Sequence, residues 1–150
     1  MSRDNIDIAK EDANKAVASL KKYEENRLAD QKADQKKTKA DTKYLVNDVK
    51  ANEKADVAYL KKHEENELAD EKADQKKTKA DTENSVDNVK ANEKAKVAKL
   101  KSDKSKVGAE RRAAYRKADV TANIEKAKSN TKHYKTYAAA DAERIKTYNK

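Results

Sequence analysis

Apolar residues recur along the first hundred residues at steps of three and four, which is the spacing of one face of an α-helix. This face runs from Val17 to Val57 in 11 steps over 40 residues, a mean period of about 3.64 residues. A period of 3.5 residues gives a left-handed supercoil, and one of about 3.67 gives a right-handed supercoil. The pattern therefore predicts an all-α fold whose main element is a long, nearly straight helical rod.

A repeat of 40 residues carries this helical face. Residues 11–50 and 51–90 are two copies that agree at 25 of 40 positions, and KADQKKTKADT at Lys32–Thr42 returns unchanged at Lys72–Thr82. A third copy begins at residue 91 and fades after residue 101. Because the unit contains no turn signal, we expect each copy to extend the same helix by roughly 60 Å, at 1.5 Å per residue.

The middle of the predicted face is polar. Between Leu28 and Leu45 it carries Gln31, Gln35, Thr38 and Thr42, and the second copy carries Glu71, Gln75, Thr78 and Thr82. Polar residues at core positions lower the stability of a coiled coil but fix its register and its number of strands. These layers favour a trimer over a dimer. A larger bundle, pairing with other chains, and a stretch that merely faces solvent stay open.

A cluster of small and polar residues at 102–108, ending in Gly108, is the one segment that looks like a break or cap. From residue 109 to 150 the apolar positions follow a heptad, with alternating steps of four and three. The chain is therefore predicted to consist of a repeat helix at 1–101, a break at 102–108 and a shorter heptad helix at 109–150. The last helix continues the rod or folds back as a hairpin, and continuation is favoured because one glycine is a weak turn signal.

We interpret the apolar and polar positions of this face as the seam of an oligomer, because a helix so poor in apolar residues needs a partner. The predicted seam consists of Val17, Leu20, Leu28, Gln35, Thr38, Thr42, Leu45, Val49, Val57, Leu60, Leu68, Gln75, Thr78, Thr82, Val89, Val97, Leu100, Val120, Ile124, Tyr134, Ile145 and Tyr148.

Composition supports a helical rod over a globule. Leucine, isoleucine, valine and phenylalanine make up about 13% of the chain, whereas alanine, glutamate, lysine, leucine and arginine make up about 55%. The chain has no proline and one glycine, unlike most disordered chains. No apolar run approaches the roughly 18 residues of a membrane span, and Met1–Lys10 lacks the apolar part of a signal peptide. We therefore expect a soluble protein without a membrane span or a standard signal peptide.

Positive charge is concentrated in the last third of the chain. Residues 101–150 carry a net charge of +8 out of +9 for the whole chain, together with four of the seven tyrosines. The densest basic segment consists of Arg111, Arg112, Tyr115, Arg116 and Lys117. Basic residues beside aromatic ones bind nucleic-acid phosphates and stack on unpaired bases. They also suit an acidic protein partner or a solvated helix face, and this second interpretation is favoured. A membrane surface is the least favoured.

The sequence offers no pattern typical of catalysis or of a cofactor site. Cysteine is absent, which excludes disulfides, thiolate metal sites and thiol nucleophiles. His63 and His133 are 70 residues apart, and His63 replaces Tyr23 of the other copy. Paired carboxylates such as Glu24 and Glu25 would be exposed on a thin rod, where nothing separates their pKa values. We therefore predict that the chain is not an enzyme, that it binds no metal or cofactor, and that it has no small-molecule substrate.

The segments VKANEKADVAYLKKHEEN at Val49–Asn66 and VKANEKAKVAKLK at Val89–Lys101 resemble the coiled-coil stalks of bacteriophage fibres and trimeric adhesins. Those families repeat an Ala-Asn pair followed by small apolar residues and a leucine. The resemblance implies a homotrimeric stalk that projects from a larger particle. KADQKKTKADT is also similar to the 11-residue repeats of group 3 late-embryogenesis proteins, and that resemblance implies a desiccation protectant.

These observations together predict a structural protein of a virion or a surface fibre, a helical stalk or brace that acts through self-association within a larger assembly. Its location would be the virion or the cytoplasm. Two other hypotheses stay open. One is a nucleic-acid-associated packaging or scaffold protein that uses the basic segment, and the other is the stress protectant.

Overall fold

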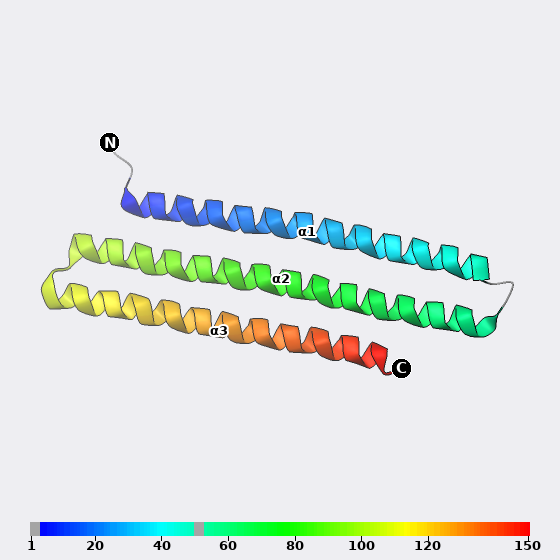
Figure 1. Cartoon of the computed structure of the whole chain (residues 1–150). Helices are drawn as coiled ribbons and strands as arrows, with labels where there is room; N and C mark the ends of the chain where they lie inside the picture. Colours follow the sequence, from blue (N-terminus) through cyan, green and yellow to red (C-terminus); the bar gives the residue numbers. More distant parts are fainter. Residues whose placement is uncertain (1–3, 50–52) are drawn as a thin grey trace. The chain divides into compact units, whose positions relative to one another are not determined.

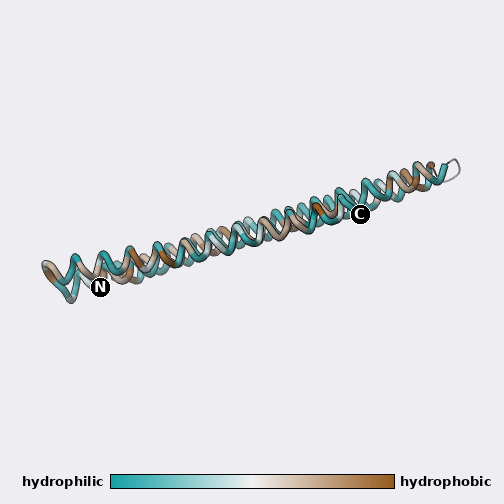
Figure 2. Tube along the Cα trace, turned by 90° about the horizontal axis from the view of Figure 1, so that it is seen from below, coloured by the Kyte–Doolittle hydropathy of each residue, from teal (hydrophilic) through white to brown (hydrophobic). Residues whose placement is uncertain are grey.

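A computed structural model describes residues 4–49 and 53–150, and all regular structure in these ranges is helical. The helices are α1 (Asn5–Val49), α2 (Lys54–Ser105) and α3 (Gly108–Tyr148). The all-α prediction is confirmed. Figure 2 shows short apolar patches interspersed with polar residues along the helices. No helix in the described part of the chain is long and apolar enough to cross a membrane.

The chain divides into two compact units, each built from segments of all three helices. Unit 1 consists of Met1–Tyr23 and Asp81–Tyr134, and unit 2 consists of Glu24–Ala80 and Lys135–Lys150. Within each unit the segment of α2 lies between the segments of α1 and α3 (Figure 1). These boundaries differ from the predicted organisation, because each unit is made of segments that are distant in sequence.

In unit 2, α1 and α2 run antiparallel. Gln31 Nε2 donates a hydrogen bond to Thr78 Oγ1 (3.0 Å), and Thr38 Oγ1 donates one to Glu71 Oε1 (2.8 Å). The second contact lies seven residues further along α1 and seven residues back along α2. In the repeat, Gln31 corresponds to Glu71 and Thr38 to Thr78. The two contacts are therefore equivalent, and the two copies pair with local twofold pseudosymmetry.

This pairing overturns the prediction that both copies lie on one uninterrupted helix. Helix α1 ends at Val49, Glu53 is not helical, and α2 begins at Lys54. The physical reason is that each copy presents the same amphipathic face, and folding back buries both faces against each other within the chain. One continuous helix would leave both faces exposed until a second chain arrived. Part of the segment predicted to be helical, residues 50–52, lies outside the described residues.

The predicted seam of the repeats is the face that packs inside the chain. Seven of its eight positions in α1 are half-buried, and all nine in α2 are half-buried or buried. Leu45 is the exception, with 44% of its surface exposed. The neighbouring Val46 is half-buried instead, so the inward face advances by one residue near the end of α1. This burial is reached within a single chain, so a role of these residues between chains is not needed to account for it.

Charged and polar contacts join α2 to α3 in unit 2. Lys77 Nζ lies 2.7 Å from Asp141 Oδ1 and 5.2 Å from the ring centre of Tyr137, and Lys76 pairs with Glu143. The hydroxyl of Tyr148 lies 2.6 Å from Asp70 Oδ1. Two carbonyl oxygens at the end of α3, those of Thr147 and Lys150, accept hydrogen bonds from Lys62 Nζ at 3.1 and 3.2 Å. A lysine beside the C-terminal end of a helix can donate to the carbonyl groups there and interacts favourably with the helix dipole.

Small residues dominate the interior of unit 1. Its buried apolar residues are Ala9, Ala13, Val86, Ala91, Val97, Ala118 and Ala122. Alanine permits close approach of helices but contributes little apolar area per residue, and no large side chain in the described ranges is fully buried. Polar contacts reinforce this interior. Ser129 Oγ lies 2.8 Å from Asn84 Oδ1 and 2.9 Å from Asp87 Oδ2, and Lys132 pairs with Glu83.

In unit 1 the predicted heptad of α3 is not the face that packs on α2, whereas in unit 2 the seam residue Tyr148 contacts Asp70 of α2 through its hydroxyl. Val120, Ile124 and Tyr134 are exposed to 56%, 50% and 73%, whereas the nearby Ala118 and Ala122 are buried. In unit 2, Ile145 is likewise 52% exposed. The alanine face packs on α2 because its small side chains fit against the alanine-rich face of that helix. The heptad with the larger side chains remains on the surface.

The predicted break at 102–108 contains the boundary between α2 and α3. Helix α2 ends at Ser105, and α3 begins at Gly108, whose φ angle of 55° lies in the left-handed region that glycine tolerates. The two helices then run antiparallel, because Lys99 pairs with Asp119 at 2.6 Å and Lys94 with Glu125 at 3.6 Å. The favoured prediction of a continuation is wrong, and the hairpin alternative holds.

Candidate functional site

The α2–α3 connection in unit 1 is held by two residues of the predicted basic segment. Arg111 donates from Nε to the carbonyl oxygen of Lys106 (3.1 Å) and from a terminal nitrogen to that of Asp103 (3.3 Å). Tyr115 donates its hydroxyl proton to Asp103 Oδ1 (2.5 Å), and this hydrogen bond raises the pKa of the Tyr115 hydroxyl. The guanidinium of Arg111 therefore binds carbonyl groups near the end of α2, where such groups lack helical partners.

The five predicted anion-binding residues thus separate into two groups. Arg111 and Tyr115 are half-buried and engaged within the chain, and the Tyr115 ring lies 5.4 Å from Lys99 Nζ. Arg112, Arg116 and Lys117 are exposed. The contacts of Tyr115 fit a structural role better than the predicted role of stacking on bases. The exposed members of the segment are the ones available to a partner.

The hairpin brings further lysines beside this segment. Between residues 94 and 117 the chain has ten lysines and arginines and two acidic residues. Six of the ten basic residues lie on α2 and the segment that follows it, and three of these six, Lys94, Lys96 and Lys99, precede the basic last third of the chain at 101–150. We define residues 94–117 as the basic hairpin. Counting the charged residues on both sides of Gly108 would locate the basic hairpin from the sequence, once a hairpin is expected there.

A second surface feature is the exposed heptad of α3 within unit 1. We define Val120, Ile124, Ala127, Thr131 and Tyr134 as the α3 stripe. All five residues are exposed. They lie at alternating steps of four and three along one face of the helix, as the sequence predicted, but no described segment of unit 1 covers them. An apolar face left exposed beside an alanine-packed interior is a candidate interaction surface.

The two histidines lie in different units and make different contacts. His133 Nε2 is 2.6 Å from Asp81 Oδ1 in unit 1, and His63 Nδ1 is 3.7 Å from Glu67 Oε1 in unit 2. Each contact is a pairwise interaction within or between helices. In residues 4–49 and 53–150 there is no group of three or more histidine and carboxylate side chains that could hold a metal ion. We find no arrangement in the described residues to which a catalytic step can be assigned.

The searches gave no relatives on which to base a function: no family model, no curated protein and no solved structure matches this chain.

Proposed function

We propose that this chain is a non-catalytic structural protein that works by associating with further copies of itself through the α3 stripe. The observation that carries the proposal is the exposure of Val120, Ile124 and Tyr134 at heptad spacing on a helix whose opposite face is already packed. Heptad spacing of apolar residues is the pattern by which helices of separate chains recognise one another.

The accessible surface supports association. The chain exposes 10742 Å² at a mass of 16.9 kDa. A compact monomer of this mass exposes roughly 7,700 Å². The excess means that folding of a single chain removes less surface from water than is usual for this length. Binding a second copy would bury part of it.

The α3 stripe is suited to pairing with its own copy. Its residues are placed nearly symmetrically about Ala127, with Ile124 three positions before it, Thr131 four positions after it, and Val120 and Tyr134 seven positions away on either side. In an antiparallel pair, Ala127 would lie at the crossing point, where a small side chain permits close approach. Val120 would then face Tyr134 of the partner subunit. A contact of this kind is isologous and closes as a twofold dimer.

This proposal moves self-association from the repeats to α3. The trimer stays a prediction, but the glutamine and threonine layers that favoured it have partners within the chain. We therefore propose a dimer as the first assembled state. A virion or surface fibre as its setting rests on the sequence resemblance alone.

The test is the oligomeric state of the full chain, measured by light scattering after size exclusion and by sedimentation equilibrium. We expect the wild type to form dimers as its concentration rises from micromolar to millimolar. The Ile124→Asp variant should remain monomeric, because it places a charge at the centre of an apolar contact. Asn123→Asp is the matched control, since it adds the same charge one position outside the stripe and should dimerise as the wild type does.

A wild type that stays monomeric throughout this range would refute the proposal. Equal effects of Ile124→Asp and Asn123→Asp would also refute it, because a general charge effect would then explain the change. Circular dichroism should show equal helicity for both variants, since both positions are exposed.

The basic hairpin favours a second candidate function, the binding of nucleic acid by its backbone. Arg112 and Arg116 are exposed and lie one helical turn apart on α3. Binding to duplex DNA should weaken as salt rises, with a slope of about −0.9 per phosphate contacted in a double-logarithmic plot. In the Arg112→Gln/Arg116→Gln variant the slope should become shallower by about 1–2. Absent binding, or binding insensitive to salt, would exclude this function.

A further inference from the structure

Between α2 and α3 in unit 1 lies a cavity of about 460 Å³. This volume falls within the usual range for small-molecule sites, about 300–1,000 Å³. Its apolar lining consists of Ala91, Ala95, Ala98, Ala114, Ala118 and Ala122. Alanine methyl groups leave space between two helices that larger apolar side chains would fill, so a thin apolar body has room there.

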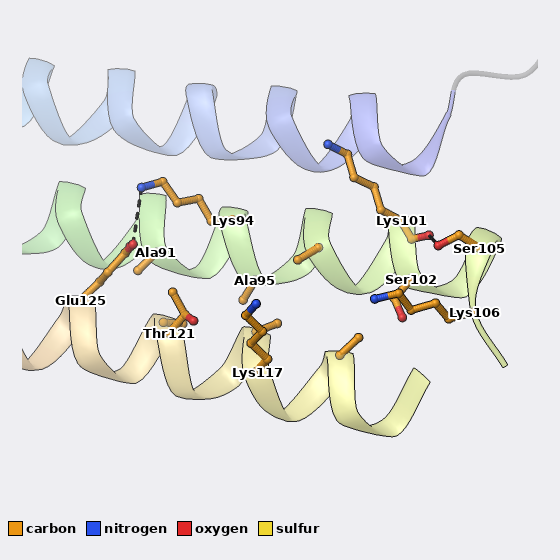
Figure 3. Close-up of a pocket in the computed structure, with 14 residues that line it drawn as sticks. Ala91, Lys94, Ala95, Lys101, Ser102, Ser105, Lys106, Lys117, Thr121 and Glu125 are labelled. Carbon is orange, nitrogen blue, oxygen red and sulfur yellow. Dashed lines mark hydrogen bonds and ion pairs between the residues drawn. The ribbon is translucent and has the colours of Figure 1, made fainter. Parts of the chain in front are cut away.

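A buried hydroxyl without a partner lines the same cavity. Ser102 is 4% exposed, and its Oγ makes no hydrogen bond within the described residues. Buried hydroxyl groups are normally hydrogen-bonded. Ser105, on the next turn of the same helix, donates to the carbonyl oxygen of Lys101 at 3.0 Å. Ser102 makes no equivalent bond, and Figure 3 shows its hydroxyl on the side of α2 that faces α3.

Charge is distributed unevenly along the cavity. At the end formed by Lys94, the ammonium group is paired with Glu125 at 3.6 Å. Toward the α2–α3 connection, the side chain of Lys106 lies beside Ser102, and in the middle of the cavity the side chain of Lys117 extends into the gap between the two helices beside Ala95 (Figure 3). The part of the cavity between Ala95 and the connection therefore offers two ammonium groups and one hydroxyl beside an apolar surface.

We propose that this cavity binds a small amphipathic anion. The apolar body, an unbranched chain or a flat ring, lies against the alanine methyl groups. The anionic head, a carboxylate or a phosphate ester, accepts a hydrogen bond from Ser102 Oγ and charge-assisted hydrogen bonds from Lys106 and Lys117. None of the residues of the α3 stripe lines the cavity, so this site stands or falls independently of the proposed dimer.

Isothermal titration calorimetry of the full chain tests the site with three probes. Octanoate carries both the apolar body and the charge, octanamide carries the body without the charge, and inorganic phosphate carries the charge without the body. We expect octanoate to bind with a stoichiometry of one per chain. Its affinity should exceed that of either other probe at least about tenfold, because each lacks one of the two interactions.

Variants assign the binding to the cavity. Lys117→Met and Ser102→Ala should each weaken octanoate binding, Lys117→Met by about tenfold. Ala95→Leu should abolish it by filling the cavity. Lys96→Met is the matched control, because this lysine is exposed on the same segment of α2, does not line the cavity, and should bind octanoate normally.

Several results would overturn the site. Octanamide or phosphate binding as tightly as octanoate would contradict recognition of an amphipathic anion. Equal weakening by Lys96→Met and Lys117→Met would indicate attraction to the general positive charge. Undetectable binding of all three probes to the wild type would exclude the site. If Ala95→Leu loses its helical circular dichroism, Ser102→Ala and Lys117→Met decide the question.

Discussion

The antiparallel pairing of the two repeats makes a quantitative prediction about the contact between Gln31 and Thr78. Thr78 is 5% exposed, its hydroxyl donates to the carbonyl oxygen of Asp74 (2.9 Å), and it accepts from Gln31 Nε2 (3.0 Å). Thr78→Val keeps the shape of the side chain and removes both bonds. The Gln31 amide loses this acceptor while its Oε1 already lacks a hydrogen-bond partner. We expect the free energy of unfolding to fall by about 1–2 kcal/mol, which is the range for a lost hydrogen bond that leaves a part-buried donor without an acceptor.

A double-mutant cycle isolates the contact. Gln31→Leu/Thr78→Val replaces both partners by apolar groups, and such a replacement is nearly neutral or stabilising. The double variant should therefore lower the free energy of unfolding by less than the sum of the losses in the two single variants, with a coupling energy of about 1 kcal/mol. Urea unfolding followed by circular dichroism is the assay, and Thr78→Val should lower the midpoint by about 0.5–1 M. Ser105→Ala is the control, because that exposed hydroxyl also donates within its own helix, to the carbonyl oxygen of Lys101, and its loss should change little.

If the effects of the two single variants on the free energy of unfolding simply add in the double variant, the pairing in this register would be refuted. An engineered cross-link provides a check that does not depend on energetics, because the chain has no cysteine of its own. Oxidised Gln31→Cys/Thr78→Cys should form a disulfide within one chain. Gln31→Cys/Glu71→Cys should not, because position 71 lies opposite residue 38, about 10 Å further along the helix axis.

Two further predictions concern the α2–α3 hairpin. Gly108→Ala should destabilise the chain by about 1–2 kcal/mol, because its φ of 55° is unfavourable for a residue with a Cβ atom, although no atom within 4 Å obstructs that Cβ; an unchanged urea midpoint would contradict this. In unit 2, the hydrogen bond from Lys77 holds the pKa of Asp141 below its ordinary value of 3.8, so this pair stabilises the fold above that pH and its contribution is lost as the pH falls through the lowered pKa. The urea midpoint of the wild type should therefore exceed that of Asp141→Asn at neutral pH, and the two should converge as the pH falls below the lowered pKa of Asp141; a gap that persists in acid would contradict the assignment.

The inward face of the repeats could be read from the sequence. The steps of three and four from Val17 onward identify the residues that are half-buried in α1, and the same phase holds through Leu60 and Val97 in α2. This succeeds because amphipathic spacing is a property of a single helix and does not depend on which helix covers it. The break near Gly108 was visible for a similar local reason, since it is the only glycine and sits among serines.

The partner of each face was decided by the tertiary structure. A repeat predicts the same face twice, and that face packs equally well on another chain or on its own second copy. Pairing within the chain needs no second molecule. Gln31 and Thr38 form equivalent hydrogen bonds in the two halves of the pseudosymmetric pair, which stabilise this arrangement. The direction of the chain after Val49 follows from this pairing and from no signal in the 40-residue unit.

For α3 the sequence determined two faces but not which of the two is buried. One carries the heptad of Val120, Ile124 and Tyr134, and the other carries Ala118 and Ala122. Hydrophobicity alone favours the heptad as the buried face, but the alanine-rich surface of α2 accepts the alanine face. Helical content, phase and charge are thus properties of the sequence by itself. The choice of face, the hairpins and the cavity beside Ser102 arise only when helices approach, because complementarity of shape belongs to pairs of surfaces.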